Sequence, residues 1–464
     1  MSGNAVEVKM LEQEGMKMDK DGSAMPRGAS CLHFAILSAS VFSLVVAGCR
    51  MPVDTGCVHA PFPVLSKPRA ITVGPHDHFF ANYAAVNAWS PDLRYVGVLE
   101  TDLNGRLPEA NERCTLGLVD THDGNRFIPV TTTACWNFQE AAMFHWMPGE
   151  KDTFVFNDVR DGKFCAIVMN WRTKEERVIP YPVSAVSRDG TKAVSVNYAR
   201  LYLTRPDYGY AGTGQDAREH REWPEDDGLW LVDLKTGDAK LILSVADGRR
   251  LMPPTKKIPG KPGNPLAYYC HTVFNADASR IFFLARSVDW YEKTTHKIPG
   301  WQTTAFTVRT DGTDLRRCFP DDWGGSHFNW LDDRTMAVTV YPPTMRGRRP
   351  GRHVTFTVGD EKNVRVLAPG ILDWDGHCVY SPDGKWMSTE GYYDANYNRQ
   401  WVLMRTCDEA VKHVGEFFVP EAYRGDYWRC DLHARWRPDG RQLGFNSVHE
   451  GSRQVYVIDV NPGR

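Results

Sequence analysis

Four of the 15 histidines occupy the same place in a repeated pattern, three residues before an aromatic side chain that begins a turn-forming stretch. The pairs are His271 with Phe274, His327 with Trp330, His377 with Tyr380, and His433 with Trp436. If these stretches are equivalent parts of repeated units, the four imidazoles point the same way and converge on one axis. Converging imidazoles suit a divalent ion such as Mn, Zn, Ni or Fe. The alternative is that each ring only hydrogen-bonds to backbone or water in a channel.

Two acidic residues stand at matching positions beside these histidines. Asp375 lies two residues before His377, and Asp431 lies two residues before His433, so an Asp-x-His pattern occurs twice. Strand alternation places each carboxylate on the same face as its histidine. We predict that both carboxylates bind the metal or orient the imidazoles. A capping or turn role is the alternative for both.

Cationic and aromatic side chains next to the last histidine are candidates for binding an acidic substrate. Arg429 lies four residues before His433, and its guanidinium fork matches two carboxylate or sulfate oxygens. Trp428 and Arg435 flank the same element. We therefore predict that Arg429 binds the substrate and assists catalysis, with Trp428 and Arg435 beside it.

Proton transfer needs an acid or a base, and the segment ahead of the first repeat offers two candidates. His78 and Tyr83 lie in the stretch HDHFFANYAAVNAW, which ends at Trp89. Both side-chain types transfer protons in enzymes, and we predict a catalytic role for both. Packing is the alternative for Tyr83. The loop Trp136–Gln139 holds a similar place before the second repeat.

The elements that must position these residues form seven similar units. Each unit has an aromatic or apolar residue, a short polar turn and an apolar strand-like run, followed by a second β-rich segment. The units begin at Trp89, Trp146, Val186, Phe274, Trp330, Tyr380 and Trp436. Seven such units predict an all-β fold, a seven-bladed β-propeller of four-stranded antiparallel blades over residues 69–464.

This fold accounts for the common position of the histidines. The stretch leading into each turn is predicted to be the innermost strand, with its imidazole facing the central channel while the aromatic packs between blades. The longest interval between units runs from Val186 to Phe274 and contains polar or Pro/Gly-rich stretches near residues 203–228 and 248–266. We expect these stretches to be insertions on one face, where a substrate cleft is usually built.

The N-terminal part has the features of an export signal. Residues 31–48 form an apolar run that ends in small residues before Cys49, a pattern that resembles the lipobox of bacterial lipoproteins. We expect residues 1–49 to be a signal peptide, with Cys49 lipidated, and residues 50–68 to be a Pro-rich linker. Met25 would make a more ordinary start, so residues 1–24 are a candidate mis-called extension. An uncleaved membrane helix is the alternative.

Composition narrows the set of partners. The formal net charge is -2 and no Lys/Arg-rich tract stands out, so we do not expect nucleic acid as a partner. Aromatic residues make up 12% of the chain and include 15 Trp, enough to pack blades and leave some for stacking on sugars. We expect a monomer that is exported to the bacterial cell envelope and meets the membrane only through its lipid anchor.

Two known families share these patterns. The repeated SPDG-type hairpins resemble the propeller of TolB-like proteins, and histidines before such hairpins, with Arg429 four residues before His433, resemble the oligogalacturonate lyase family. That resemblance implies a seven-bladed propeller that binds manganese through three His and one Gln and cleaves uronate oligosaccharides by β-elimination. The chain departs from the family pattern where Cys430 and Arg435 replace a Gln and a second His.

Together the residues and the resemblance predict a metal-dependent lyase for uronate-containing glycans, with manganese as the expected ion. The metal and Arg429 would neutralise the sugar carboxylate, and His78 or Tyr83 would act as base or leaving-group acid. Two alternatives remain. One is a non-catalytic TolB-like binding or scaffold propeller, and the other is a metal-dependent glycan hydrolase, for which no serine elbow or spaced acidic pair stands out.

Overall fold

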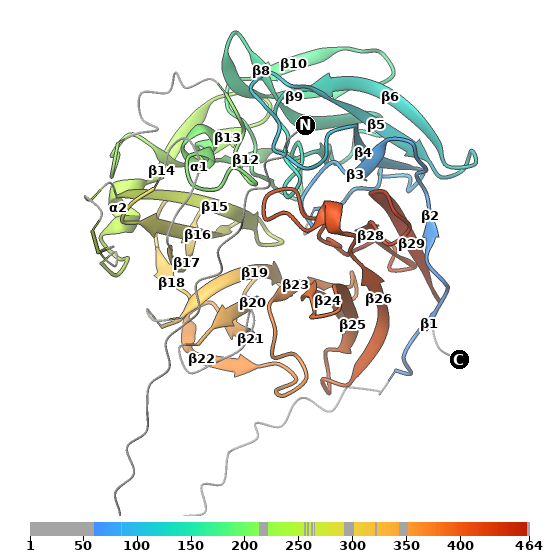
Figure 1. Ribbon diagram of the computed structural model, residues 1–464. Coiled ribbons are helices and arrows are strands. Elements are labelled where there is room, and N and C mark those ends of the chain that lie inside the picture. The colour runs from blue at the N-terminus through green and yellow to red at the C-terminus, as the bar shows by residue number, and fades with distance from the viewer. Residues whose placement is uncertain are drawn as a thin grey trace, which may run out of the picture. The chain divides into compact units, whose positions relative to one another are not determined.

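The computed structural model describes residues 60–461 except 85, 213–220, 255–256, 258, 261–262, 264, 292–300, 321–322 and 343–350. Over the described residues the chain forms seven antiparallel sheets, six of four strands and one of five. The sheets follow one another around a ring (Figure 1). The fold is a seven-bladed β-propeller, as the repeats predicted.

Strands follow in chain order within the first six blades. Blade 1 contains β3 (Asp77–Phe80), β4 (Tyr95–Thr101), β5 (Cys114–Asp120) and β6 (Arg126–Thr133). Blade 2 contains β7 (His145–Trp146), β8 (Thr153–Arg160), β9 (Lys163–Asn170) and β10 (Glu176–Ile179). Blade 3 contains β11 (Ala185–Val186), β12 (Lys192–Ser195), β13 (Gly228–Asp233) and β14 (Ala239–Ser244).

The second half of the ring repeats this arrangement. Blade 4 contains β15 (Leu266–Phe274), β16 (Arg280–Val288), β17 (Gln302–Arg309) and β18 (Arg316–Arg317). Blade 5 contains β19 (Gly324–Trp330), β20 (Thr335–Tyr341), β21 (Arg352–Thr357) and β22 (Asp360–Val366). Blade 6 contains β23 (Gly376–Tyr380), β24 (Trp386–Tyr393), β25 (Asn398–Arg405) and β26 (Val411–Phe418).

The aromatic or apolar residue that marks each repeat has a constant structural place. In blades 2 to 7 it is the last residue of the first strand, as Trp146 is in β7 and Trp330 is in β19. Trp89 forms an isolated bridge with Val96 in blade 1. First strands of neighbouring blades contact one another, as β19 contacts β23, so these strands surround the axis. The side chains before each marker are therefore brought to the centre of the ring.

Blade 7 joins the two ends of the described chain. It contains β27 (Arg435–Trp436), β28 (Gln442–Ser447) and β29 (Gln454–Asn461), and β29 also pairs with β1 (Val64–Leu65) and β2 (Arg69–Ala70). The sheet thus begins at Val64, ahead of the expected start of the propeller at residue 69. Phe62 packs against Trp386 of blade 6 with ring centroids 5.2 Å apart. Strands from the two ends of the described chain thus pair within blade 7, and this pairing closes the ring. It also covers the edge of β29 that would otherwise be unpaired.

The long interval between the third and fourth repeats is occupied by two connections. The first joins β12 to β13 and contains helix α1 (Tyr198–Tyr202), which Asn197 caps by accepting a hydrogen bond from the backbone N–H of Arg200. The second joins β14 to β15 and contains helix α2 (Val245–Arg249). A further 3-10 helix, η1 (Glu421–Tyr423), precedes blade 7. The β12–β13 connection supplies Thr204, Arg205, Asp207 and Tyr208 to the lining of a cavity.

The predictions about export concern residues that the structure does not describe. Cys49 and the whole expected signal peptide lie outside the described residues. Within the described part, no helix is long and apolar enough to cross a membrane. Seven cysteines of the described chain are buried free thiols, which pack as small apolar side chains.

The closing strands generate a prediction about stability. Removing residues 1–70 deletes β1 and β2 and uncovers the apolar side of blade 7, whereas removing residues 1–59 leaves both strands. We expect the shorter chain to lose about 3 kcal/mol of unfolding free energy relative to the longer one. Urea unfolding of both chains measures the difference. Equal midpoints and slopes would show that the ring does not depend on this closure.

Candidate functional site

The four histidines of the repeat stand on or beside the first strands of blades 4 to 7. His271 lies in β15, His327 in β19 and His377 in β23, while His433 precedes β27. Only His377 has regular strand pairing, opposite Glu390 of β24. Simple alternation was therefore the wrong reason for the direction of the other three side chains.

Local irregularities of the backbone aim those three imidazoles. The register of β15 shifts between Cys270 and Val273, and that of β19 shifts between Gly325 and Phe328. His271 and His433 have φ of 57° and 47°, in the left-handed region that non-glycine residues rarely adopt. Met143 holds the same place in blade 2 with φ of 50°. This backbone turn thus recurs in blades 2, 4 and 7, and in blades 4 and 7 the residue that adopts it is histidine.

Three of the four imidazoles gather around one side chain, Tyr83. Its ring centroid lies 5.7 Å from that of His271, 5.6 Å from that of His377 and 5.6 Å from that of His433. The ring of His377 lies 3.9 Å from that of His327 and 4.7 Å from that of His433. His327, His377 and His433 therefore form a contiguous group, which we call the imidazole triad, and Tyr83 separates it from His271.

Carboxyl groups fix the orientation of two triad rings. His327 Nδ1 lies 2.9 Å from Asp375 Oδ1, and the Tyr341 hydroxyl donates to the other oxygen of that carboxylate at 2.6 Å. His377 Nδ1 lies 2.8 Å from Glu390 Oε1. In both rings Nε2 is the nitrogen left for another partner, the arrangement typical of metal-binding histidine. Asp375 thus orients the histidine of the preceding blade, not His377 as the Asp-x-His spacing suggested.

Asp431 has different partners from those expected. Its carboxylate forms ion pairs with Arg399 and with Arg429, whose Nε donates to Oδ2 at 2.9 Å. Burial raises the pKa of Asp431, but the two guanidinium groups outweigh it and hold the pKa well below its usual range. Asp431 is therefore a buried anion beside His433 that anchors two arginines.

Burial keeps the four imidazoles neutral. Desolvation lowers the pKa of His377 to about 4 and holds those of His271 and His433 well below the ordinary value. The Nε2 atom of His433 and the Nδ1 atom of His271 are buried with no hydrogen-bond partner in the described structure. Neutral imidazoles with free nitrogens can bind a metal or accept a proton.

Two glutamates of the site were missed by the sequence analysis. Glu140 Oε1 lies 3.9 Å from His271 Nδ1, and Glu390 holds His377. Burial raises the pKa of each to about 8, so both are protonated at neutral pH in the metal-free protein. Glu140 directly follows the loop Trp136–Gln139, which the sequence analysis names as a candidate, so its neighbourhood could have been found from the sequence. Glu390 carries no local motif, because its role comes from the register of β24 against β23.

The three residues near His433 that were predicted to bind substrate have different surroundings. Arg429 is buried and donates to Asp431, to Gln139 Oε1 at 3.2 Å and to Tyr208 Oη at 3.5 Å. Trp428 packs against the hydrophobic core of blades 1 and 2. Arg435 is 1% exposed and donates to Asn82 Oδ1 and to the backbone oxygen of Val86. These contacts account for Arg435 without a ligand.

His78 lies apart from the imidazole triad in its contacts. Its Nδ1 is 3.1 Å from Gln454 Oε1 and its Nε2 is 3.1 Å from Glu100 Oε2, so both ring nitrogens have partners. None of the described ring contacts joins it to Tyr83 or the triad; its ring contact is with Phe127. Of the two proton-transfer candidates, the structure brings only Tyr83 into the histidine cluster, and burial raises the pKa of its phenol well above 10.0.

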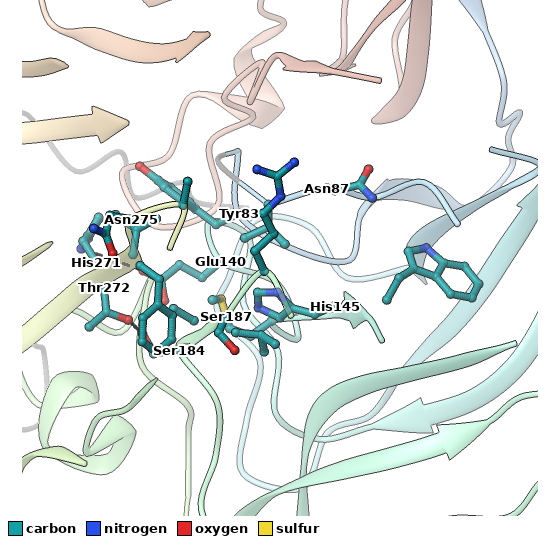
Figure 2. A pocket seen from close by; sticks show the side chains of 18 of the residues that line it. Tyr83, Asn87, Glu140, His145, Ser184, Ser187, His271, Thr272 and Asn275 are labelled. Atoms are coloured by element: carbon teal, nitrogen blue, oxygen red, sulfur yellow. Dashed lines mark hydrogen bonds and ion pairs between the residues drawn. The ribbon is translucent and has the colours of Figure 1, made fainter. Parts of the chain in front are cut away.

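Two cavities border the cluster. A cavity of about 440 Å³ is lined by Tyr83, His271 and Glu140, which Figure 2 shows together with His145 and Ser184. A larger one of about 670 Å³ is lined by Asp375, Tyr208 and three arginines. The rings of Tyr208 and His271 are 4.6 Å apart, so His271 lines the smaller cavity and contacts a residue that lines the larger one. The arginines are Arg205, Arg286 and Arg429. Three aspartates, Asp207, Asp375 and Asp426, line the same cavity, so only a guanidinium with free donors is suited to bind an anionic ligand there.

The donor chemistry of the triad fits a divalent metal. Two rings are oriented through Nδ1, and the third has a buried Nε2 without a partner, so three neutral nitrogens are available. As they stand, however, the described residues include no group of three or more His, Cys, Asp or Glu side chains spaced to hold an ion. His327, His377 and His433 would need to shift to bind one, and His271 lies beyond Tyr83.

The chain matches no known family profile and no curated protein in sequence. Its structure is similar to that of oligogalacturonate lyase from Vibrio parahaemolyticus, with a TM-score of 0.55 and 15% identity. It is also similar to an oligogalacturonate lyase in complex with manganese, with a TM-score of 0.56 and 15% identity. Each match covers 86% of this chain and 97% of the other. TolB from Acinetobacter baumannii gives a TM-score of 0.35 at 13% identity, over 68% of this chain and 62% of TolB. The fold of this chain is therefore that of oligogalacturonate lyase.

Proposed function

We propose that this propeller is a metal-dependent lyase that cleaves uronate-containing oligosaccharides by β-elimination. The observation that carries the proposal is the imidazole triad beside a cavity lined by three arginines, Arg205, Arg286 and Arg429. An acidic sugar needs positive charge around it, and elimination needs a base and an acid within one site. The shared fold with oligogalacturonate lyases, one of which was solved with manganese, supports the same reaction class.

The reaction removes the proton at C5 of a uronate and expels the oxygen at C4, which leaves a carbon–carbon double bond between C4 and C5. The C5 proton is only weakly acidic, so the adjacent carboxylate must be neutralised while a base takes the proton. His327, His377 and His433 would hold a divalent ion, manganese by the comparison, and such an ion neutralises that carboxylate when bound. Arg429 adds positive charge to the wall of the same cavity.

His271 is the imidazole best suited to accept the C5 proton. Burial, followed by the charges of Arg286 and Arg205, lowers its pKa, so the ring is neutral. Its Nδ1 has no hydrogen-bond partner, and its ring packs against Tyr208 of the larger cavity. Tyr83 is protonated, and its hydroxyl also lacks a partner, which suits it to supply a proton to the leaving oxygen.

A hydrolase would need a water activated by a base and positioned for attack on the glycosidic carbon. The described site offers no reason to prefer that reaction, and its arginines and neutral base serve elimination directly. The TolB-like scaffold alternative gives no reason why three buried imidazoles converge on Tyr83. Burying such polar groups without partners costs stability. Proteins tolerate that cost at functional sites, and a scaffold would have no need of it.

Metal binding should depend on the carboxyl groups that orient the triad. We expect the purified protein to bind about one Mn²⁺ per chain and the substitutions D375N and E390Q to weaken binding about 10- to 100-fold. Glu416, an exposed residue of the same blade that lies 3.7 Å from His413, gives a matched control. Equilibrium Mn²⁺ titration measures all four proteins. Binding that is as tight in E390Q and D375N as in E416Q would contradict the assignment of the metal to the triad.

Tyr83 and Tyr268 allow a controlled test of proton transfer, because the hydroxyl of each is buried without a hydrogen-bond partner. Neither Y83F nor Y268F therefore removes a hydrogen bond, and both proteins should fold. We expect Y83F to lower the rate of formation of near-ultraviolet-absorbing unsaturated product about 100-fold on oligogalacturonates. Y268F should keep the rate of the parent protein. If Y83F formed product as fast as Y268F, Tyr83 would have no part in the reaction.

The protonated state of Glu140 makes stability depend on pH. Its pKa in the folded protein is about 8, above the value of roughly 4.3 for an unfolded chain. The stabilisation it gives is therefore complete below the unfolded pKa and is lost as the pH rises through 8. We expect the parent protein to lose a few kcal/mol of unfolding free energy relative to E140Q between about pH 5 and pH 9. Urea unfolding of both proteins across this pH range measures the difference. If their unfolding free energies changed equally with pH, Glu140 would not be a buried neutral carboxyl group.

A further inference from the structure

The three arginines of the larger cavity differ in what they bind. Arg205 donates to Asp207 through two bonds of 3.0 Å and 2.8 Å, and Arg429 is held by Asp431, Gln139 and Tyr208. Arg286 is 3% exposed, and its Nε and one terminal nitrogen are buried without a hydrogen-bond partner in the described structure. Two of the three cations are thus neutralised by the protein, and the third has free donors.

No carboxylate of the described chain compensates Arg286. It forms no ion pair there, and Glu140, the carboxyl group with which it interacts electrostatically, is protonated at neutral pH. A buried guanidinium with unpaired N–H groups costs stability, and such groups are kept where a ligand completes them. The fork of Arg286 has the geometry to bind one carboxylate through two parallel hydrogen bonds.

An aromatic platform stands beside this guanidinium. Trp301 lines the same cavity and is 50% exposed. Its ring lies 5.6 Å from the guanidinium carbon of Arg286 and 5.1 Å from that of Arg205. An exposed indole in a polar cavity is a usual surface for stacking a sugar ring. Tyr427 lines the cavity as well.

Arg286 stands on a different blade from the triad: it lies in β16 of blade 4, whereas His327, His377 and His433 belong to blades 5 to 7. The charge of Arg286 lowers the pKa of His271, whereas Arg399 and Arg429 are the arginines that act on His377. A carboxylate at the triad and a carboxylate at Arg286 would therefore belong to different sugar rings.

We infer that Arg286 and Trp301 form a second carboxylate subsite, which binds the uronate next to the one that reacts. The subsite makes the protein select two contiguous acidic sugars over one acidic sugar linked to a neutral one. Arg286 is thus a specificity-determining residue. The inference rests on the proposed function only for the identity of the ligand as an acidic oligosaccharide.

Calorimetric binding to the purified, Mn²⁺-loaded protein tests the subsite with two probes, digalacturonate and a disaccharide of one uronate linked to a neutral sugar. The parent protein should bind digalacturonate roughly 10- to 100-fold more tightly, the range expected for a charged bidentate pair. R286M should abolish the preference by weakening only digalacturonate. R188Q, at an exposed arginine that lines the smaller cavity, should keep it.

Two further measurements separate a binding role from a structural one. R286M should melt at the same temperature as the parent protein or higher when no ligand is present, because it removes an uncompensated buried charge. W301A, at a half-exposed side chain, should weaken both disaccharides about equally. A lowered melting temperature for R286M with an unchanged preference would overturn the inference, and so would a parent protein that binds neither disaccharide.

The lyase assay tests the proposed reaction, whereas the binding measurements test the subsite. If the parent protein prefers digalacturonate through Arg286 but forms no unsaturated product from any oligogalacturonate, the subsite stands and the proposed reaction fails. If product forms and R286M leaves both the product yield and the binding preference unchanged, the reaction stands and the subsite is refuted.

Discussion

The site depends on burying polar groups at the centre of an apolar ring. Seven blades bring their first strands to one axis, where side chains are removed from water and every unpaired nitrogen or oxygen is costly. The chain meets that cost by pairing: Asp375 holds His327, Glu390 holds His377, and Arg429 and Arg399 share Asp431. Some buried groups nevertheless have no hydrogen-bond partner in the described structure. Four of them, those of Tyr83, His271, His433 and Arg286, belong to the histidine cluster or line its cavities.

Desolvation also sets the protonation states that the proposed chemistry needs. The same burial that keeps imidazoles neutral raises the pKa of Glu140 and Glu390 to about 8. A cation held near the triad would oppose this effect at Glu390, because positive charge favours the ionised carboxylate. Ionisation of the orienting carboxyl groups and binding of the proposed metal would thus favour each other.

The sequence predicted the number of blades and the axis because both depend on a period. Marker residues such as Trp146 and Trp330 end the first strands, and the histidines three residues earlier meet at the centre. What it could not predict depends on contacts between blades. Asp375 was assigned to His377 but binds His327 across a blade boundary. The left-handed backbone at His271 and His433 replaced the expected alternation, and Arg286 stands in no motif at all. His78, predicted with Tyr83 to act as base or acid, has both ring nitrogens within hydrogen-bond distance of a side-chain oxygen.

The proposed metal site consists of His327, His377 and His433, which would hold one divalent ion beside the arginine-lined cavity. Anomalous X-ray diffraction from crystals of the protein soaked in Mn²⁺ can locate that ion. We expect one strong anomalous peak within about 2.3 Å of an imidazole nitrogen from each of these three residues, a distance typical of metal–histidine bonds. Crystals whose manganese peak lies elsewhere, or whose triad carries none at saturating Mn²⁺, would contradict it.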